Sequence, residues 1–347
     1  MLNFASKIKV QQDLMLKLMP LFAFVTPLAI LYILNPLMTP WDSSQAVVSA
    51  QDSFQLMWKG RTFQLFFIWL IALEFILNWE TIKPKISKHN TASLIAVGGA
   101  LVLPTLYVIA ETYSSLNSAL ASWTSQNGVA FASSMPLAIE YLVFSGMFCL
   151  ITFLYFGNKG LKRFALPALF VALIGVLYII DNVFPYGAFT PFQLLVPTTA
   201  TLAAISLGWM GYGTVLGTES GMPTLQVTGP EGIAKFAIAW PCAGIESLLI
   251  FTAVALLFLQ RMPMSWKAKA GYFAVGASLT YFINILRIDT IFQIGMQYGV
   301  TSNEVQNFHL YYGPLYSIAW IVSYPLIIIL AQVLWQKMKT RNSTVRL

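Results

Sequence analysis

The sequence predicts an all-α integral membrane protein with about eight transmembrane helices, plus an interfacial helix and a short hairpin on the outer face. Of its 347 residues, 57% are hydrophobic and only 10% are charged, and the mean hydropathy is +0.70. A water-soluble domain of this length could not carry so apolar a surface. Because we find no internal repeat and no low-complexity linker, we expect one polytopic membrane domain, 1–347.

Eight stretches have the length of about 20 mainly apolar residues that crosses a bilayer. The first follows a basic head and has no small-residue cleavage pattern behind it, so we expect a span there and not a cleavable signal peptide. The predicted spans are 18–37, 62–79, 92–110, 136–156, 164–181, 243–260, 271–290 and 312–334.

A ninth apolar stretch, 191–209, is a doubtful span. Pro197 lies near its start, and four hydroxyl side chains lower its hydrophobicity, namely Thr198, Thr199, Thr201 and Ser206. Such a stretch is also typical of a helix that lies in the membrane interface. The sequence of 191–209 alone leaves both arrangements open.

The basic residues decide between them. Clusters of lysine and arginine precede the first and seventh spans and follow the second, fourth and eighth. If 191–209 lies on the outer face, these clusters share the cytoplasmic side, as the positive-inside rule requires. We therefore expect a multi-pass protein of the cell membrane with both termini cytoplasmic and no nucleic-acid partner, despite the formal net charge of +7. The basic residues left elsewhere are Lys59, Arg61, Lys235 and Arg287.

The segment 224–240 alternates apolar and polar residues around a Gly-Pro-Glu-Gly turn, which predicts a short outer hairpin ending near Cys242. The hairpin either offers an edge to a substrate or simply covers the protein. In this topology Cys242 begins the sixth span on the outer face, and His309 precedes the eighth span on the same face. Arg287 lies about 25 Å from the inner end of the seventh span, so three reactive side chains converge on one membrane face.

Taken singly, a cysteine, Arg287 and His309 each have an ordinary explanation. A lone cysteine in a membrane helix is usually a small hydrophobe, and Cys149, deep in the fourth span, is expected to be one. Two cysteines are also too few for a disulfide framework. Arg287 can form an ion pair or snorkel to the interface; its candidate partners are Asp289, Glu246 and Glu111. His309 is also compatible with a place among interfacial tyrosines.

Together the three residues fit amide cleavage. Attack on an amide needs a thiolate, a proton carrier for the leaving amine and positive or N–H groups facing the oxyanion. Cys242 near a helix start, the imidazole of His309 and the permanent cation of Arg287 supply one of each. Supporting roles fall to Ala243 and Gly244, expected to have free N–H groups at the helix start, and to Asn284, expected to orient the guanidinium. Glu246 is either a helix-dipole partner or, as we slightly favour, a partner that holds Arg287.

The stretches PCAGIESLL, NILRI and FHLYYG, in this order and spacing, resemble the exosortase/archaeosortase family. The resemblance covers the predicted catalytic part, 191–347. It implies a cysteine protease and transpeptidase that cleaves the C-terminal sorting signal of surface proteins, made of a short motif, a transmembrane helix and a basic tail. It assigns catalysis to Cys242, Arg287 and His309, through an acyl-enzyme released to a lipid amine, another acceptor or water.

The residues that follow Cys242 differ from the common bacterial motif and indicate a branch of that family. Bacterial members commonly carry Cys-Ser-Gly followed by a basic residue, whereas this chain has alanine at 243, isoleucine at 245 and the acidic Glu246. The pattern is more similar to the archaeal branch, archaeosortases. We expect no cofactor, and with two histidines in the chain a zinc site has too few ligands.

The competing class is a polytopic transporter, because Glu74 and Glu140 are carboxylates within predicted spans. Against it, the sequence has no inverted repeat and no matching pair of broken helices. A third class, an assembly or scaffold subunit, predicts that none of the three reactive residues matters.

Overall fold

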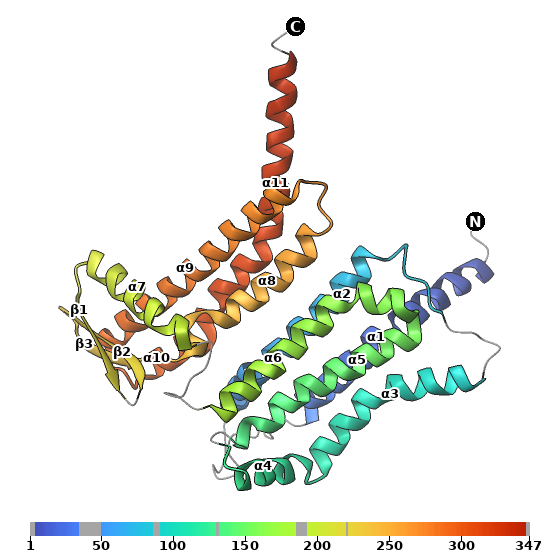
Figure 1. Ribbon diagram of the computed structural model, residues 1–347, viewed down its shortest axis with the longest axis horizontal. Helices are drawn as coiled ribbons and strands as arrows, with labels where there is room; N and C mark the ends of the chain where they lie inside the picture. Colours follow the sequence, from blue (N-terminus) through green and yellow to red (C-terminus); the bar gives the residue numbers. More distant parts are fainter. Residues whose placement is uncertain are drawn as a thin grey trace. The chain divides into compact units, whose positions relative to one another are not determined.

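The protein, seen in a computed structural model, divides into two compact units, Met1–Pro185 and Tyr186–Leu347 (Figure 1). The structure describes residues 4–34, 50–85, 91–129, 132–184, 193–219 and 221–344. The side chains of Lys59, Arg61, Pro241 and the C-terminal basic cluster lie outside the described residues. The second unit contains all of the predicted catalytic part, 191–347.

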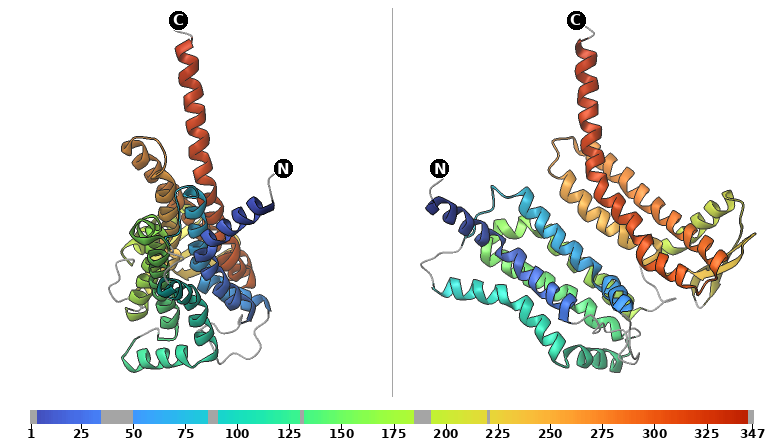
Figure 2. Two further views of the ribbon diagram at one scale, coloured as in Figure 1. Left: turned by 90° about the vertical axis from the view of Figure 1, so that its right-hand side faces the viewer. Right: turned by 180° about the vertical axis from the view of Figure 1, so that it is seen from behind.

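The first unit is a helical bundle whose long helices run side by side (Figure 2). Its interior is aromatic: Phe24 makes edge-to-face contacts with Phe67 and Phe148 at centroid distances of 5.4 Å each. Gly175 lets α6 approach the backbone of α5, since a Cβ there would lie 2.9 Å from the carbonyl oxygen of Ala138. The helices are α1 (Phe4–Leu34), α2 (Ala50–Leu77), α3 (Thr91–Tyr113), α4 (Leu116–Gln126), α5 (Met135–Arg163) and α6 (Ala165–Val183).

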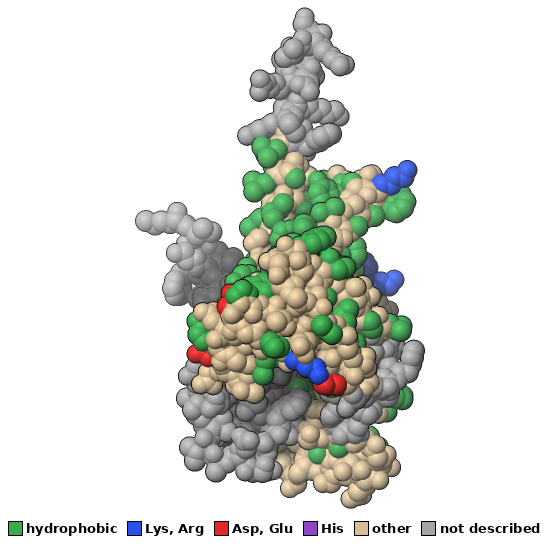
Figure 3. All heavy atoms as spheres, turned by 90° about the vertical axis from the view of Figure 1, so that its left-hand side faces the viewer, with side chains coloured by type: hydrophobic (Ala, Val, Ile, Leu, Met, Phe, Trp, Pro, Cys, Tyr) green, Lys and Arg blue, Asp and Glu red, His purple; other side chains and the backbone are tan. Residues whose placement is uncertain are grey.

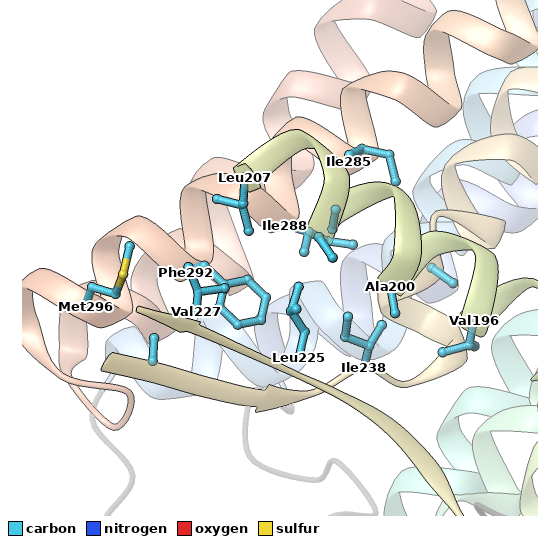
Figure 4. Packing of buried hydrophobic residues seen from close by; sticks show 14 of the residues in the cluster. Val196, Ala200, Leu207, Leu225, Val227, Ile238, Ile285, Ile288, Phe292 and Met296 are labelled. Atoms are coloured by element: carbon cyan, nitrogen blue, oxygen red, sulfur yellow. The ribbon is translucent and has the colours of Figure 1, made fainter. Parts of the chain in front are cut away.

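The second unit combines helices with an antiparallel sheet in the order β1-β2-β3. Side chains from α7, the sheet and α9 point toward one another and form its core, including Leu207, Leu225 and Phe292 (Figure 4). The elements are α7 (Val196–Trp209), β1 (Gly213–Glu219), β2 (Met222–Gly229), β3 (Gly232–Ala237), α8 (Ile245–Leu259), α9 (Trp266–Tyr298), α10 (Asn303–Asn307) and α11 (Gly313–Thr344).

The sheet corrects the prediction of an all-α fold with a two-stranded hairpin. Strands β2 and β3 form the predicted hairpin, with Gly229 paired to Gly232. The third strand, β1, was missed because its residues are almost all exposed, so burial on one face imposes no alternation on its sequence. The short helix α4 was also missed, because its sequence is polar and lies between the apolar stretches.

The count of eight spans is not confirmed. Among the described residues, four helices are long and apolar enough to cross a membrane: Thr91–Tyr113, Ala132–Arg163, Trp266–Tyr298 and Gly313–Leu334. The other four predicted spans overlap shorter apolar helices, Met15–Leu31, Phe63–Leu77, Ala165–Ile180 and Ile245–Leu259. Hydrophobic side chains spread over the face drawn in Figure 3, where charged ones are few and scattered, as expected of a membrane protein.

Helix α9 carries an exposed apolar stripe that ends next to Arg287. Its members are spaced so that they share one face of the helix; they are Val275, Leu279, Phe282 and Leu286. The next residues on this face are polar, Thr290, Gln293 and Gln297. A change from apolar to polar side chains is expected where a membrane-crossing helix leaves the hydrocarbon layer.

Gly276 permits the close approach of α8, α9 and α11. A Cβ at this position would lie 2.3 Å from Phe251 and 2.6 Å from Tyr324. Gly271, one turn and a half earlier in α9, has no atom within 4 Å of the corresponding point. The two glycines therefore form a matched pair on one helix.

We predict that Gly276→Ala destabilises the purified protein by about 1–3 kcal/mol, because the rings must move out of a packed core. Gly271→Ala should be neutral or stabilising by up to about 1 kcal/mol, through helix propensity. Thermal unfolding in detergent measures both. Equal unfolding temperatures for the two variants would contradict this account of the packing.

Candidate functional site

Cys242 lies in a tight turn between the sheet and α8. Residues Trp240–Ala243 form a 3₁₀ turn, Gly244 has a left-handed backbone with φ of 85°, and α8 begins at Ile245. The N–H of Cys242 donates to the carbonyl of Ala239 at 3.0 Å. Helix α8 thus starts directly after Ala243 and Gly244, with Gly244 as its N-terminal cap, and the role of their N–H groups stays a prediction.

Asn284 of α9 holds this turn in place. Its Nδ2 donates to the carbonyl oxygen of Cys242 at 2.9 Å, and its side chain is fully buried. A Cβ on Gly244 would lie 2.9 Å from the carboxamide of Asn284, so the glycine is needed for both the left-handed backbone and the close approach. The amide of Asn284 therefore binds the cysteine turn, and the expectation that Asn284 also orients Arg287 stays a prediction.

Arg287 connects the cysteine turn with the segment that carries His309. Its Nη2 donates to the carbonyl oxygen of His309 at 2.9 Å, and its charge interacts with Cys242 and Glu246. Gly313 at the start of α11 makes room for the side chain, since a Cβ there would lie 2.5 Å from Nε of Arg287. One cation therefore contacts two segments that are distant in the sequence.

His309 lies in a π-helical segment, Phe308–Tyr312, between α10 and α11. Such wide turns are rare and are frequent at functional sites. The contact with Arg287 uses the backbone carbonyl of His309, so this hydrogen bond does not consume the imidazole. The half-buried side chain of His309 is thus carried by a segment that Arg287 fixes.

The candidate acidic partners of Arg287 are separated by the fold. Glu246, in the first turn of α8, interacts electrostatically with Arg287. Asp289 accepts a hydrogen bond from Ser206 of α7 at 2.6 Å. Glu111 belongs to the first unit, where Asn117 donates to it at 2.9 Å. The observed contacts favour Glu246.

Thr199 and Tyr281 support the site and were missed by the sequence reasoning. The hydroxyl of Thr199 on α7 lies 2.7 Å from the hydroxyl of Tyr281 on α9 and 3.5 Å from the carbonyl of Ala243. The available signal was Thr199 itself, which we noted only for its effect on hydrophobicity. Its full burial shows that this threonine faces the protein.

Comparison with known proteins identifies one family. The family described as transmembrane exosortase matches residues 57–335, which cover most of the chain and include the cysteine turn, Arg287 and the π-helical segment. No curated protein and no solved structure matches the chain.

Both cysteines of the chain are free thiols, as the low cysteine count predicts.

We predict that Gly244→Ala destabilises the protein by more than Gly211→Ala. Both glycines have positive φ, of 85° and 92°, and Gly211 follows the C-terminal end of α7, where the N–H of Tyr212 donates to the carbonyl of Leu207. A Cβ at Gly211 meets nothing within 4 Å. The shared backbone strain costs about 1 kcal/mol, and the collision with Asn284 adds to it only at Gly244. Chemical denaturation of the two variants measures the difference.

A double-variant cycle provides the control. The double variant with Gly244→Ala and Asn284→Ala should lose about 1 kcal/mol less stability than the sum of the two single variants. The reason is that Asn284→Ala removes most of the atoms with which the new Cβ collides. Strict additivity would show that Gly244 and Asn284 do not constrain each other.

Proposed function

The chain belongs to the transmembrane exosortase family, and from this membership we propose that it is a membrane-embedded cysteine protease and transpeptidase with its nucleophile at Cys242. Members of this family act on proteins that carry a C-terminal sorting signal. The observation that carries the proposal is the position of Arg287, which interacts with Cys242 and binds the backbone of His309. This position supports a site that combines a nucleophile, a cation and a proton carrier.

In the proposed reaction the thiolate of Cys242 attacks the scissile carbonyl, and the negative charge moves to the carbonyl oxygen. Arg287 faces this oxyanion or a carboxylate of the substrate; it keeps further N–H groups besides the one bound to His309. His309 takes the proton of the thiol, and when the carbon–nitrogen bond breaks it gives this proton to the leaving amine. The acyl group remains on the sulfur of Cys242.

The second half of the reaction releases the acyl group. An acceptor amine, such as that of a lipid, or a water molecule loses its proton to His309 and attacks the thioester, which restores the thiol. The proposed substrates are membrane-anchored proteins whose tail consists of a short motif, a transmembrane helix and a basic cluster. The end of the apolar stripe at Leu286 supports a site at the membrane edge, where the peptide bond before such a helix would lie.

We further propose that the site is extracytoplasmic, in a multi-pass protein with both termini in the cytoplasm and α7 in the outer interface. The basic clusters support this orientation. Helix α7 exposes apolar residues, Leu202, Ile205 and Trp209, on the side away from its packed face, which fits an interfacial helix.

The closer likeness to archaeosortases rests on the acidic residue after the cysteine motif. Glu246 interacts with Arg287, and a basic residue at the same position would repel that cation. The acidic residue and the half-buried arginine therefore form a consistent pair in this chain.

The transporter alternative depends on Glu74 and Glu140, which are buried at 3% and 0% exposure. Asn78 donates to Glu74 at 2.7 Å, and Gln64 donates to Glu140. Because an amide partner stabilises each carboxylate within the first unit, a structural role explains both residues.

We predict that Cys242→Ala abolishes processing of a reporter that carries a sorting tail encoded by the same genome, with a loss of at least about 1,000-fold. Cys149→Ala is the matched control and should process the reporter normally, because that thiol lies within α5. Immunoblots of cells producing each variant measure the cleaved reporter. Normal processing by Cys242→Ala would exclude a cysteine mechanism.

We also predict that a membrane-impermeant thiol reagent added to intact cells labels Cys242 and spares Cys149. His309→Ala should slow this labelling near neutral pH, because the imidazole would no longer take the thiol proton. Mass spectrometry of the labelled protein distinguishes the two cysteines. Labelling of Cys242 only after the cells are opened would overturn the proposed orientation.

A further inference from the structure

The outer edge of β3 has backbone groups that no neighbouring strand uses. The N–H of Ile238 donates to the carbonyl of Pro223 in β2 at 2.8 Å. Since hydrogen-bonding direction alternates along a strand, the residues at 232, 234 and 236 also face β2, and Ile233, Lys235 and Ala237 face outward. Among the described residues, no backbone hydrogen bond outside the strand ladder involves these three.

This edge leads directly into the cysteine turn. Strand β3 ends at Ala237, and the carbonyl of Ala239 accepts the N–H of Cys242. The position of the strand is fixed from behind, because Phe236 packs edge-to-face on Phe292 of α9 at 5.1 Å. A peptide paired with the outer edge of β3 would therefore lie along a fixed strand that leads to Cys242.

We infer that the outer edge of β3 binds the extended segment that precedes the scissile bond of the substrate, as an added strand. This inference rests on the proposed function, since it assumes a peptide substrate cleaved at Cys242. Strand addition to a sheet edge is a common way to bind extended peptides, with affinity supplied by backbone hydrogen bonds. It requires little of the substrate side chains.

The fold also sets the direction of the added strand. Gly232, at the start of β3, packs against the carbonyl of Met296. Along α9, Met296 lies about 15 Å beyond Leu286, where the apolar stripe ends. Strand β3 thus runs from outside the membrane toward Cys242. A substrate whose transmembrane helix follows the scissile bond approaches from the same side, so its added strand runs parallel to β3.

The first test uses proline at outward-facing positions, because proline removes an N–H that the ladder does not need. In purified full-length protein in lipid nanodiscs, Lys235→Pro should raise the KM for the tail-bearing reporter roughly tenfold, with kcat little changed. Thr218→Pro makes the same change on the outer edge of β1 and should leave both constants unaltered. Glu219→Ala also breaks the exposed Lys235–Glu219 ion pair, so it controls for the loss of the Lys235 side chain in Lys235→Pro.

Hydrogen exchange gives a second measurement that does not depend on turnover or on the stability of the proline variant. In Cys242→Ala protein, adding the reporter should slow amide exchange in 233–237 and leave exchange in 213–219 unchanged. An alternative result is that the amides of 233–237 exchange slowly without reporter, and more slowly still as the protein concentration rises. That result would assign the edge to a second copy of the chain and overturn the inference.

The outcomes separate this inference from the proposed function. If the wild-type protein processes the reporter and Lys235→Pro matches Thr218→Pro, with no protection of 233–237, the edge inference is wrong and the proposed function stands. If the wild-type protein processes no such reporter, the proposed function fails and the edge inference fails with it.

Discussion

The contacts of the half-buried cation of Arg287 are the interactions on which the arrangement of the second unit depends. An arginine inside a membrane protein is costly unless its charge and its donors are used. Here one donor binds the carbonyl of His309, and the charge interacts with Cys242 and Glu246. The same contacts link Arg287 to the segments that carry Cys242 and His309, the residues of the proposed site.

Two glycines make this arrangement sterically possible. Gly313 admits the arginine side chain, and Gly244 admits Asn284 while it turns the chain from the 3₁₀ turn into α8. The cysteine turn is held by Asn284 of α9, which binds the carbonyl of Cys242, and by Thr199 of α7, which lies near the carbonyl of Ala243. For the proposed nucleophile, a turn fixed in this way would hold the thiol in the orientation that attack on a carbonyl needs.

Helix α7 has two roles that its composition alone does not separate. Its exposed face carries apolar residues, whereas Thr199 and Ser206 on its packed side bond to Tyr281 and Asp289 of α9. The hydroxyl groups that lower the hydrophobicity of 191–209 are thus partly those that attach it to the site. Hydropathy counts each side chain equally, and only packing reveals which face it occupies.

The sequence by itself determined the membrane class, the family and the hairpin of β2 and β3, because apolar length, residue identity in motifs and alternation are local properties. It also selected Cys242, Arg287 and His309 by the chemistry of their side chains, a choice that remains a proposal. Only the tertiary structure decided that Asn284 binds the cysteine turn, that α8 starts at Ile245 and that β1 completes a sheet. These features depend on hydrogen bonds and contacts between distant segments, whose register no local pattern specifies.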